Sequence, residues 1–344
     1  GINLSRQISL GAGIPETVPA YGINMVCGSG MKTIMNAFVS IQHGMNNLVI
    51  AGGAESMSGA PYLLPDKTRK GIKMGSFEVK DHMLYDALTD AFGNMHMGIT
   101  AENIVDKYKL TREAQDKFAI TSQERARKAR DAGRFDDEIV PIEVKSRKKS
   151  FVFSTDEYIK DDTTLEILSK LRPAFKKDGS VTAGTSSGIN DGASFVMLAS
   201  ESMVQKYNLK PLAEVVGVGQ GGVDPNYMGL GPVPAIEKAL QNTNMSFNDI
   251  ELMELNEAFA AQSLGVFEDL KAAYGETEES LMERTNVNGG AIALGHPVGA
   301  SGNRITVTLV HEMKKRGVRY GLASLCIGGG MGTAVVLKNM EESK

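Results

Sequence analysis

Apolar positions along the chain follow two alternating periods, and each period predicts a different kind of element. Short apolar runs of the kind that forms strands lie at residues 48–51, 193–199, 213–218, 251–255 and 321–326. Apolar residues recur three and four positions apart from Met31 to Ile41 and predict a helix that ends near His43. Because the two patterns alternate on both flanks, we expect α/β units with largely parallel or mixed sheets.

The middle of the chain differs in composition from its flanks. Residues 58–187 carry more than half of all charged residues in little more than a third of the positions. This segment therefore reads as an insertion between two α/β parts. Helices are predicted within it at 98–109 and 111–132, the second one beginning at Thr111 as its N-cap.

Composition limits the classes of protein to consider. At 344 residues and 42% hydrophobic, the chain is long enough for two or three domains, and no apolar stretch approaches the roughly 20 residues of a membrane-spanning helix. A net charge of -4 argues against general attraction to nucleic acid, so we expect a small-molecule partner. The two cysteines form neither a CxxC pair nor a zinc spacing, which predicts a reducing, cytoplasmic setting and no metal.

Both cysteines stand where an apolar run meets a glycine turn. Residues 24–30 read NMVCGSG and residues 323–330 read ASLCIGGG, a pattern that predicts strand, turn and helix, with the helix N-terminus favouring the thiolate. Cys27, which a helix follows, is the stronger candidate nucleophile. A helix terminus lowers a thiol pKa near ~8.5 by about one unit at most, so a separate base is required. After Cys326 the glycines lead instead into a strand at 333–337.

Two further segments carry polar groups suited to thiol chemistry. His296 lies in NGGAIALGHPVGASG, residues 288–302, a loop whose glycines and proline hold the imidazole rigidly, whereas we interpret His43, His82 and His311 as ordinary surface or core residues. Asn256 in LNEAFA, residues 255–260, has two interpretations. It is either a helix N-cap or an amide that fixes a water or an oxyanion.

These segments, in this order and spacing, resemble the thiolase family over essentially the whole chain. The motifs are NxxCGSG at Cys27, NEAF at Asn256, GHPxGxSG at His296 and CxGGGxG at Cys326, and HMG with TAEN at residues 96–103 is most similar to the biosynthetic branch. The resemblance implies an α/β fold of two related βαβ-containing halves in a five-layered αβαβα core, with an inserted loop domain that binds coenzyme A. The implied boundaries are 1–57 with 188–208 for the N-terminal half, 58–187 for the loop domain and 209–344 for the C-terminal half.

The resemblance also implies a reaction, the reversible Claisen condensation of two acetyl-CoA molecules to acetoacetyl-CoA and CoA. Cys27 carries the acetyl group as a thioester, His296 accepts the proton of its thiol, and Cys326 acts as acid and base. One oxyanion site consists of His296 and a water held by Asn256, and the other of the N–H groups of Cys27 and Gly328. No cofactor is implied, because the coenzyme A thioesters are substrates.

A larger set of contacts to coenzyme A and the acyl group follows from the resemblance. It comprises Leu88, His96, Met97, Tyr158, Lys160, Phe175 and Ser187, together with Met228, Ala258 and Phe259 at the acyl end. Thr185 departs from the family pattern, since many relatives have Asn there. Thiolases usually begin with a strand and an Arg-Thr-Pro segment ahead of the part seen here, so we expect a truncated or incomplete chain, and the family favours a homodimer or homotetramer.

Four alternatives stay open on the sequence. A 3-ketoacyl-CoA thiolase of broader chain length in fatty-acid degradation would use the same residues. A ketoacyl synthase uses a Cys with two histidines or with His and Asn, which the second cysteine, Cys326, argues against. A cysteine hydrolase would not need Cys326, and a non-catalytic relative that binds coenzyme A or lipid would not need Cys27, His296 or Cys326.

Overall fold

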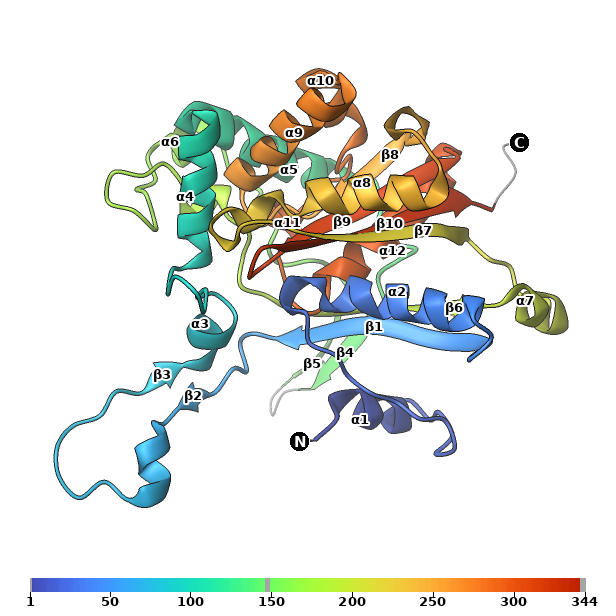
Figure 1. Ribbon diagram of the computed structural model, residues 1–344, viewed down its shortest axis with the longest axis horizontal. Helices are drawn as coiled ribbons and strands as arrows, with labels where there is room; N and C mark the ends of the chain where they lie inside the picture. Colours follow the sequence, from blue (N-terminus) through green and yellow to red (C-terminus); the bar gives the residue numbers. More distant parts are fainter. Residues whose placement is uncertain (1, 146–148, 341–344) are drawn as a thin grey trace.

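The computed structural model describes residues 2–145 and 149–340, which fold around two β-sheets (Figure 1). The larger sheet has the strand order β7-β10-β9-β8, and these strands are β7 Ala213–Gly222, β8 Leu252–Leu255, β9 Tyr320–Ile327 and β10 Met331–Asn339. Its β8 and β9 are parallel and its other neighbours antiparallel, so it is mixed, as the sequence predicts. The smaller sheet pairs β1 Leu48–Ser56 antiparallel with β6 Asp191–Ala199.

Helices alternate with these sheets in layers. Between the two sheets lie α2 Ser29–Gln42, which packs on β1, and α12 Ser301–Arg316, which packs on β6, β8 and β9 (Figure 1). On the outer face of the larger sheet α8 Pro232–Thr243 covers β7 and β10. Beyond the smaller sheet lies α1 Leu4–Gly11 (Figure 1). Each sheet therefore buries a face against the central helix pair, which forms part of the core.

The two central helices approach each other closely enough to bring two predicted site segments together. Met31, Ile34 and Met35 of α2 are buried, and His43 is its C-cap, which confirms the helix predicted from the apolar spacing. A Cβ at Gly30 would lie 2.9 Å from the Asn303 nitrogen, so only glycine permits this approach. The turn that carries Cys27 thus meets the segment that follows His296.

The charged middle of the chain attaches to the C-terminal part through its helices. The helices α4 Met97–Tyr108 and α5 Arg112–Asp131 confirm the two that were predicted, and the Thr111 side chain caps α5 by accepting the Ala114 N–H at 3.0 Å. Both helices pack against α9 Ala260–Tyr274, and α5 also packs against α11 Ala291–Leu294. The insertion therefore forms one wall around the loop that ends at His296.

The remaining elements are short. They are α3 His82–Asp86, α6 Leu165–Ser169, α7 Glu201–Tyr207, α10 Glu278–Arg284, the pair β2 Tyr62–Leu63 with β3 Lys80–Asp81, and the pair β4 Ile142–Lys145 with β5 Ser150–Phe153. The segment around β2 and β3 extends away from both sheets (Figure 1). Across residues 2–145 and 149–340, no helix is long and apolar enough to cross a membrane.

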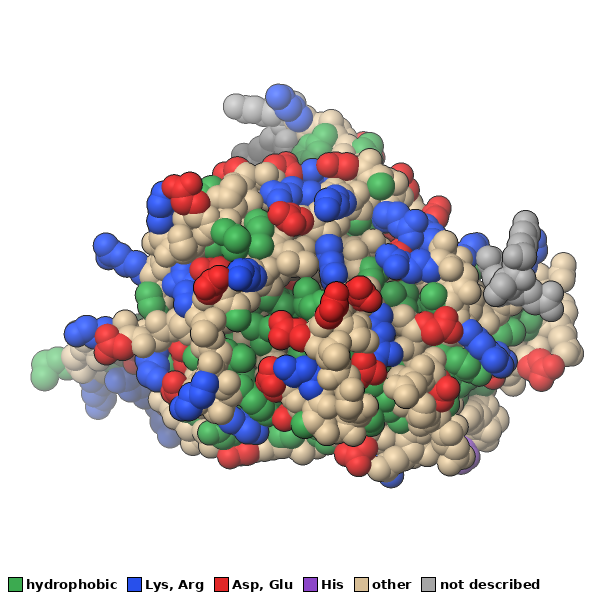
Figure 2. Space-filling view, turned by 90° about the horizontal axis from the view of Figure 1, so that it is seen from above, with side chains coloured by type: hydrophobic (Ala, Val, Ile, Leu, Met, Phe, Trp, Pro, Cys, Tyr) green, Lys and Arg blue, Asp and Glu red, His purple; other side chains and the backbone are tan. Residues whose placement is uncertain are grey.

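One local prediction is wrong. The residues before Cys27 do not form a strand; a 3-10 turn at Val26–Gly28 precedes α2 directly. After Cys326 the predicted turn and strand are present, as β9, a glycine turn and β10. The boundaries of the predicted halves and of the loop domain stay a prediction. On the face shown in Figure 2, acidic and basic side chains are interspersed rather than gathered by sign.

Candidate active site

Cys27 lies in a tight turn that is fixed by its own neighbours. Ser29 Oγ accepts the Met25 N–H at 2.8 Å and donates to the Val26 carbonyl at 2.7 Å, and Asn24 Oδ1 accepts the Val26 N–H at 2.9 Å. These bonds hold Val26 at a φ of 47°, a conformation that β-branched residues rarely adopt. The strained turn therefore sets the direction of the Cys27 side chain at the start of α2.

The backbone at the helix start favours the Cys27 thiolate, as expected, but burial has the larger effect on its pKa. Burial raises the pKa of the Cys27 thiol to about 11, although hydrogen bonds from the N–H groups of Gly328 and Cys27 act in the opposite sense, and the nearby Glu55 charge raises it further. Desolvation of the thiolate thus outweighs the backbone dipoles. The resting residue is a thiol, which agrees with the predicted need for a base.

Cys326 stands at the end of β9 and is buried beside Cys27. Burial raises the pKa of the Cys326 thiol well above its ordinary value, and the charge of Cys27 raises it further. The turn of Cys27 and the end of β9 are in direct contact, since a Cβ at Gly28 would lie 2.3 Å from the Ile327 side chain. Gly329 and Gly330 turn the chain into β10 with φ values of 89° and 85°. By contrast, a Cβ at Gly328 would make only ordinary van der Waals contacts.

His296 and Asn256, which are 40 residues apart in the sequence, lie side by side in the structure. Asn256 Nδ2 lies 3.5 Å from His296 Nδ1, and Asn256 Oδ1 has no hydrogen-bond partner within the described residues. The helix-cap interpretation of Asn256 is wrong, because α9 begins at Ala260 with Phe259 as its N-cap. Instead the Asn256 N–H donates to the Ser324 carbonyl at 3.0 Å and so continues the pairing of β8 with β9. The interpretation as a free amide that can fix a water or an oxyanion remains.

A hydroxyl that the sequence reasoning missed orients the imidazole. Ser301 Oγ lies 2.5 Å from His296 Nδ1 and donates to the Pro297 carbonyl at 3.0 Å. Because its hydrogen points to that carbonyl, the Ser301 oxygen accepts the Nδ1 hydrogen, which leaves Nε2 able to accept a proton. The GHPxGxSG motif contains Ser301, so the motif itself carried the signal.

The imidazole is neutral at physiological pH. Burial lowers the pKa of His296 to about 4, and the positive charge of Arg304 lowers it further. The Asn190 Oδ1 atom accepts the His296 backbone N–H at 3.1 Å and holds the loop. Since Asn190 is far from His296 in sequence, no local pattern could have identified this contact. A neutral, oriented imidazole can accept the proton of a thiol.

The residues predicted for the acyl end come together around the second thiol. Cys326 packs in one apolar cluster with Met97, Met228, Ala258 and Phe259. Aromatic contacts extend this cluster toward the surface, since Phe175 lies edge-on to Phe259 at 5.9 Å and the His96 ring stacks on Phe175 at 4.8 Å between ring centroids.

The other predicted coenzyme A contacts divide into two groups. The Leu88 carbonyl accepts the Met97 N–H at 2.9 Å, and the Ser187 N–H donates to the Ala258 carbonyl at 3.0 Å, so the backbone of each is hydrogen-bonded to a member of the apolar cluster. Tyr158 and Lys160 form a separate pair, with the Lys160 ammonium 4.8 Å from the Tyr158 ring centroid. Their contact with coenzyme A stays a prediction.

The other histidines lie outside this arrangement. His43 caps α2, and His82 lies 2.8 Å from Asp86 on the surface. His311 is on α12, where burial lowers its pKa. None of these contacts joins the two thiols, which fits their interpretation as ordinary residues.

Known proteins are similar in sequence to this chain over most of its length. The family model described as thiolase, N-terminal domain, matches residues 1–202, and that described as thiolase, C-terminal domain, matches residues 209–339. The chain is 51% identical over 341 residues to the acetyl-CoA acetyltransferase of Allochromatium vinosum, covering 99% of this chain and 84% of the relative.

Solved structures agree with the sequence matches. The Bacillus anthracis acetyl-CoA acetyltransferase superposes with a TM-score of 0.93 at 46% identity, covering 98% of this chain and 84% of that one. The human mitochondrial 3-ketoacyl-CoA thiolase in complex with CoA superposes with a TM-score of 0.91 at 47% identity, covering 98% and 82%.

The similarity to acetyl-CoA acetyltransferases identifies the chain as an acyltransferase. The chain belongs to the thiolase family, and the predicted thiolase fold is confirmed.

Proposed function

We propose that the chain is an acetyl-CoA C-acetyltransferase that condenses two acetyl-CoA molecules to acetoacetyl-CoA and CoA, and catalyses the reverse thiolysis. The Cys27 sulfur attacks the first thioester carbonyl, and CoA leaves as its thiol. The carbanion of the second acetyl-CoA then attacks the acetyl-Cys27 carbonyl, and the Cys27 sulfur leaves. This order of steps requires two thiols with different roles, because Cys27 is bound in the thioester when the second acetyl-CoA must lose its proton.

Proton transfers are divided between two side chains. His296 accepts the Cys27 thiol proton at Nε2, which its hydrogen bond through Nδ1 to Ser301 leaves as an acceptor. Cys326 gives its thiol proton to the departing CoA sulfur, and the resulting Cys326 thiolate removes the α-proton of the second acetyl-CoA; in thiolysis the same proton transfers run in reverse. The buried, apolar surroundings of Cys326 disfavour the free thiolate, so the proton moves only when a substrate is in place.

Two sets of donors serve the negative charge that develops on oxygen. The backbone N–H groups of Cys27 and Gly328 already hydrogen-bond the Cys27 sulfur and would serve the oxygen of its thioester. His296 and a water held by Asn256 would serve the enolate oxygen, and this role is supported by Asn256 Oδ1, which has no hydrogen-bond partner in the part of the chain that the structure describes.

The observation that carries the proposal is that two thiols stand side by side: a Cβ at Gly28, next to Cys27, would lie 2.3 Å from the side chain of Ile327, next to Cys326, and the charge of Cys27 raises the pKa of Cys326. A cysteine hydrolase has no use for the second thiol, whereas a Claisen condensation needs a nucleophile and a separate base. Coenzyme A thioesters as substrates are supported by the similarity to acetyl-CoA acetyltransferases and to a thiolase solved with CoA. The homodimer or homotetramer, the cytoplasmic location and the lack of a cofactor stay predictions.

A 3-ketoacyl-CoA thiolase of broader chain length is the second candidate. The similarity to the human mitochondrial 3-ketoacyl-CoA thiolase favours it. Met97, Met228 and Phe259 are each less than a tenth exposed and pack in one apolar cluster with Cys326, and this close packing of large side chains supports the acetyl group instead.

The test compares CoA-dependent thiolysis of acetoacetyl-CoA with that of six-carbon and ten-carbon 3-ketoacyl-CoA thioesters. We expect acetoacetyl-CoA to give the highest kcat/KM, and intact mass to show one acetyl group that Cys27→Ala abolishes. Equal or better rates with longer chains would favour the second candidate. If Cys27→Ala kept both its thiolysis rate and its acetylation, the two-thiol mechanism would be overturned.

A further inference from the structure

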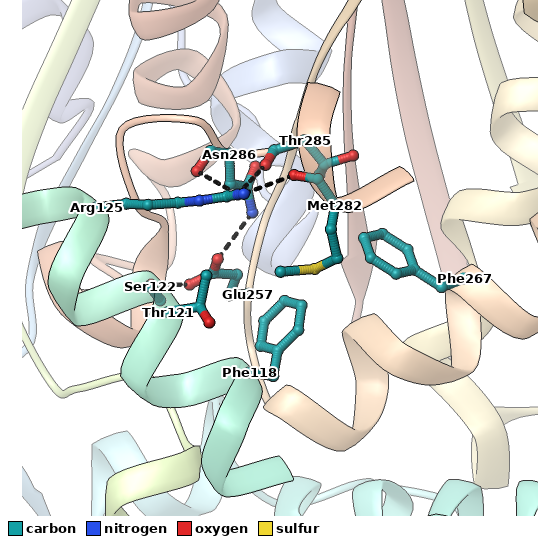
Figure 3. A pocket seen from close by; sticks show the side chains of 9 residues that line it. All are labelled: Phe118, Thr121, Ser122, Arg125, Glu257, Phe267, Met282, Thr285 and Asn286. Atoms are coloured by element: carbon teal, nitrogen blue, oxygen red, sulfur yellow. Dashed lines mark hydrogen bonds between the residues drawn. The ribbon is translucent and has the colours of Figure 1, made fainter. Parts of the chain in front are cut away.

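Glu257, the residue after Asn256, is fully enclosed and ties three separate segments together. It is 2% exposed, and it belongs to the turn between β8 and α9. Figure 3 shows its carboxylate between Ser122 of α5 and Asn286 of the segment that leads toward His296. The cavity beside it measures about 10 Å³, near the smallest space that holds one water molecule, so no substrate fits there.

Every contact of the Glu257 carboxylate requires an acceptor. Its Oε1 accepts from Asn286 Nδ2 at 2.9 Å. Its Oε2 accepts from Ser122 Oγ at 2.6 Å and from the Ile292 N–H at 3.2 Å. An amide in place of the carboxylate would present its NH₂ group to either Asn286 or Ile292, and both are donors. Glutamine, although the same size, cannot satisfy this site.

The partners of Glu257 are fixed by their own hydrogen bonds, so they cannot rotate to accept a hydrogen bond from the NH₂ group of a glutamine. Asn286 Oδ1 accepts the Leu255 N–H at 2.8 Å, and Asn286 Nδ2 donates to the Leu255 carbonyl at 2.7 Å. Ser122 Oγ accepts the Gly290 N–H at 3.0 Å. The carboxylate is therefore the one acceptor on which these three donors converge.

The hydrogen bonds of Glu257 link the segments that carry Asn256 and His296, the two polar residues of the site. Leu255 immediately precedes Asn256, and both its N–H and its carbonyl are hydrogen-bonded to the Asn286 side chain. Ile292 belongs to α11, which ends at Leu294, two residues before His296. Arg125 reinforces the same loop from α5 by donating to the carbonyls of Thr285 and Met282, each at 2.7 Å (Figure 3). Movement of Glu257 would thus change the spacing between Asn256 and His296.

We propose that Glu257 is a positioning residue for catalysis, which holds Asn256 and the His296 loop at the spacing that their shared oxyanion site requires. This inference rests on the proposed function. Misplacement of catalytic groups by about 1 Å costs roughly a hundredfold in rate. Loss of the carboxylate contacts should therefore lower turnover without removing any group that touches the substrate.

The test measures acetoacetyl-CoA thiolysis in Glu257→Gln, with the thermal midpoint measured alongside. We expect kcat to fall about tenfold to a hundredfold while KM changes less than threefold. Glu254→Gln is the matched control, because Glu254 is 1% exposed, lies on the adjoining strand and, among the described residues, makes no hydrogen bond and only a long ion pair of 3.9 Å with Arg304. It should retain kcat within about threefold.

A double-mutant cycle separates positioning from a structural role. In an Asn256→Ala background, Glu257→Gln should lower kcat by less than threefold, since the spacing it sets no longer matters. An equal loss in both backgrounds, or full activity of Glu257→Gln alone, would overturn the inference. Ser122→Ala, which removes one contact, serves if Glu257→Gln does not fold, with a smaller loss of kcat expected and the same coupling. Inactivity of the unmodified protein on every 3-ketoacyl-CoA would refute the proposed function instead.

Discussion

The reactivity of Cys27 toward a neutral alkylating agent should rise continuously with pH. Burial raises the pKa of this thiol to about 11, so the thiol form predominates over the whole assay range. Below that pKa each pH unit multiplies the thiolate fraction tenfold, from about 0.01% at pH 7 to about 1% at pH 9. The rate constant of alkylation should therefore increase about a hundredfold between these two pH values.

Iodoacetamide is a suitable reagent because it carries no charge and Cys27 is partly exposed. The second-order rate constant is measured without CoA from pH 6 to pH 10 in Cys326→Ser, so that intact mass reports Cys27 alone. His296→Asn provides the comparison: it should keep the same slope if the imidazole is neutral in the resting site, as its lowered pKa implies. A plateau from about pH 6 to pH 8 in the Cys326→Ser protein would show a preformed thiolate–imidazolium pair and would refute the reasoning.

Three further predictions concern Asn256, Cys326 and Gly231. Asn256→Ala should lower kcat roughly a hundredfold in steady-state thiolysis, because one oxyanion contact is worth about 2.7 to 4 kcal/mol, and unchanged kcat would contradict its role. Cys326→Ala should still form acetyl-Cys27 from acetyl-CoA by intact mass while turnover falls about a hundredfold or more, and full turnover would remove the acid/base assignment. Gly231→Ala should lower the free energy of unfolding by about 1–3 kcal/mol in denaturant, because the new Cβ would lie 1.9 Å from the Met331 carbonyl oxygen. Gly11→Ala is the control, since a Cβ there has open space around it. Equal effects of the two substitutions would contradict the packing argument.

The regular elements could be predicted because their signals are local. The apolar spacing from Met31 to Ile41 specifies which side of α2 is buried, and the cap at Thr111 fixes the start of α5. Cys27, His296 and Cys326 stand in short glycine-rich segments whose composition already separates them from ordinary residues. The sequence also distinguished a helix after the first thiol from a strand after the second, and this difference is present in the structure.

The tertiary structure decided how these groups are tuned. Whether Cys27 is a thiol or a thiolate depends on the balance between desolvation and two backbone N–H groups, one of which comes from Gly328 at the other end of the chain. Ser301 could be found in a motif, but Asn190 and Ser122 reach the site only through packing of distant segments. A sequence therefore determines which reactive groups are present, while their protonation and spacing depend on burial and long-range contacts that no local pattern contains.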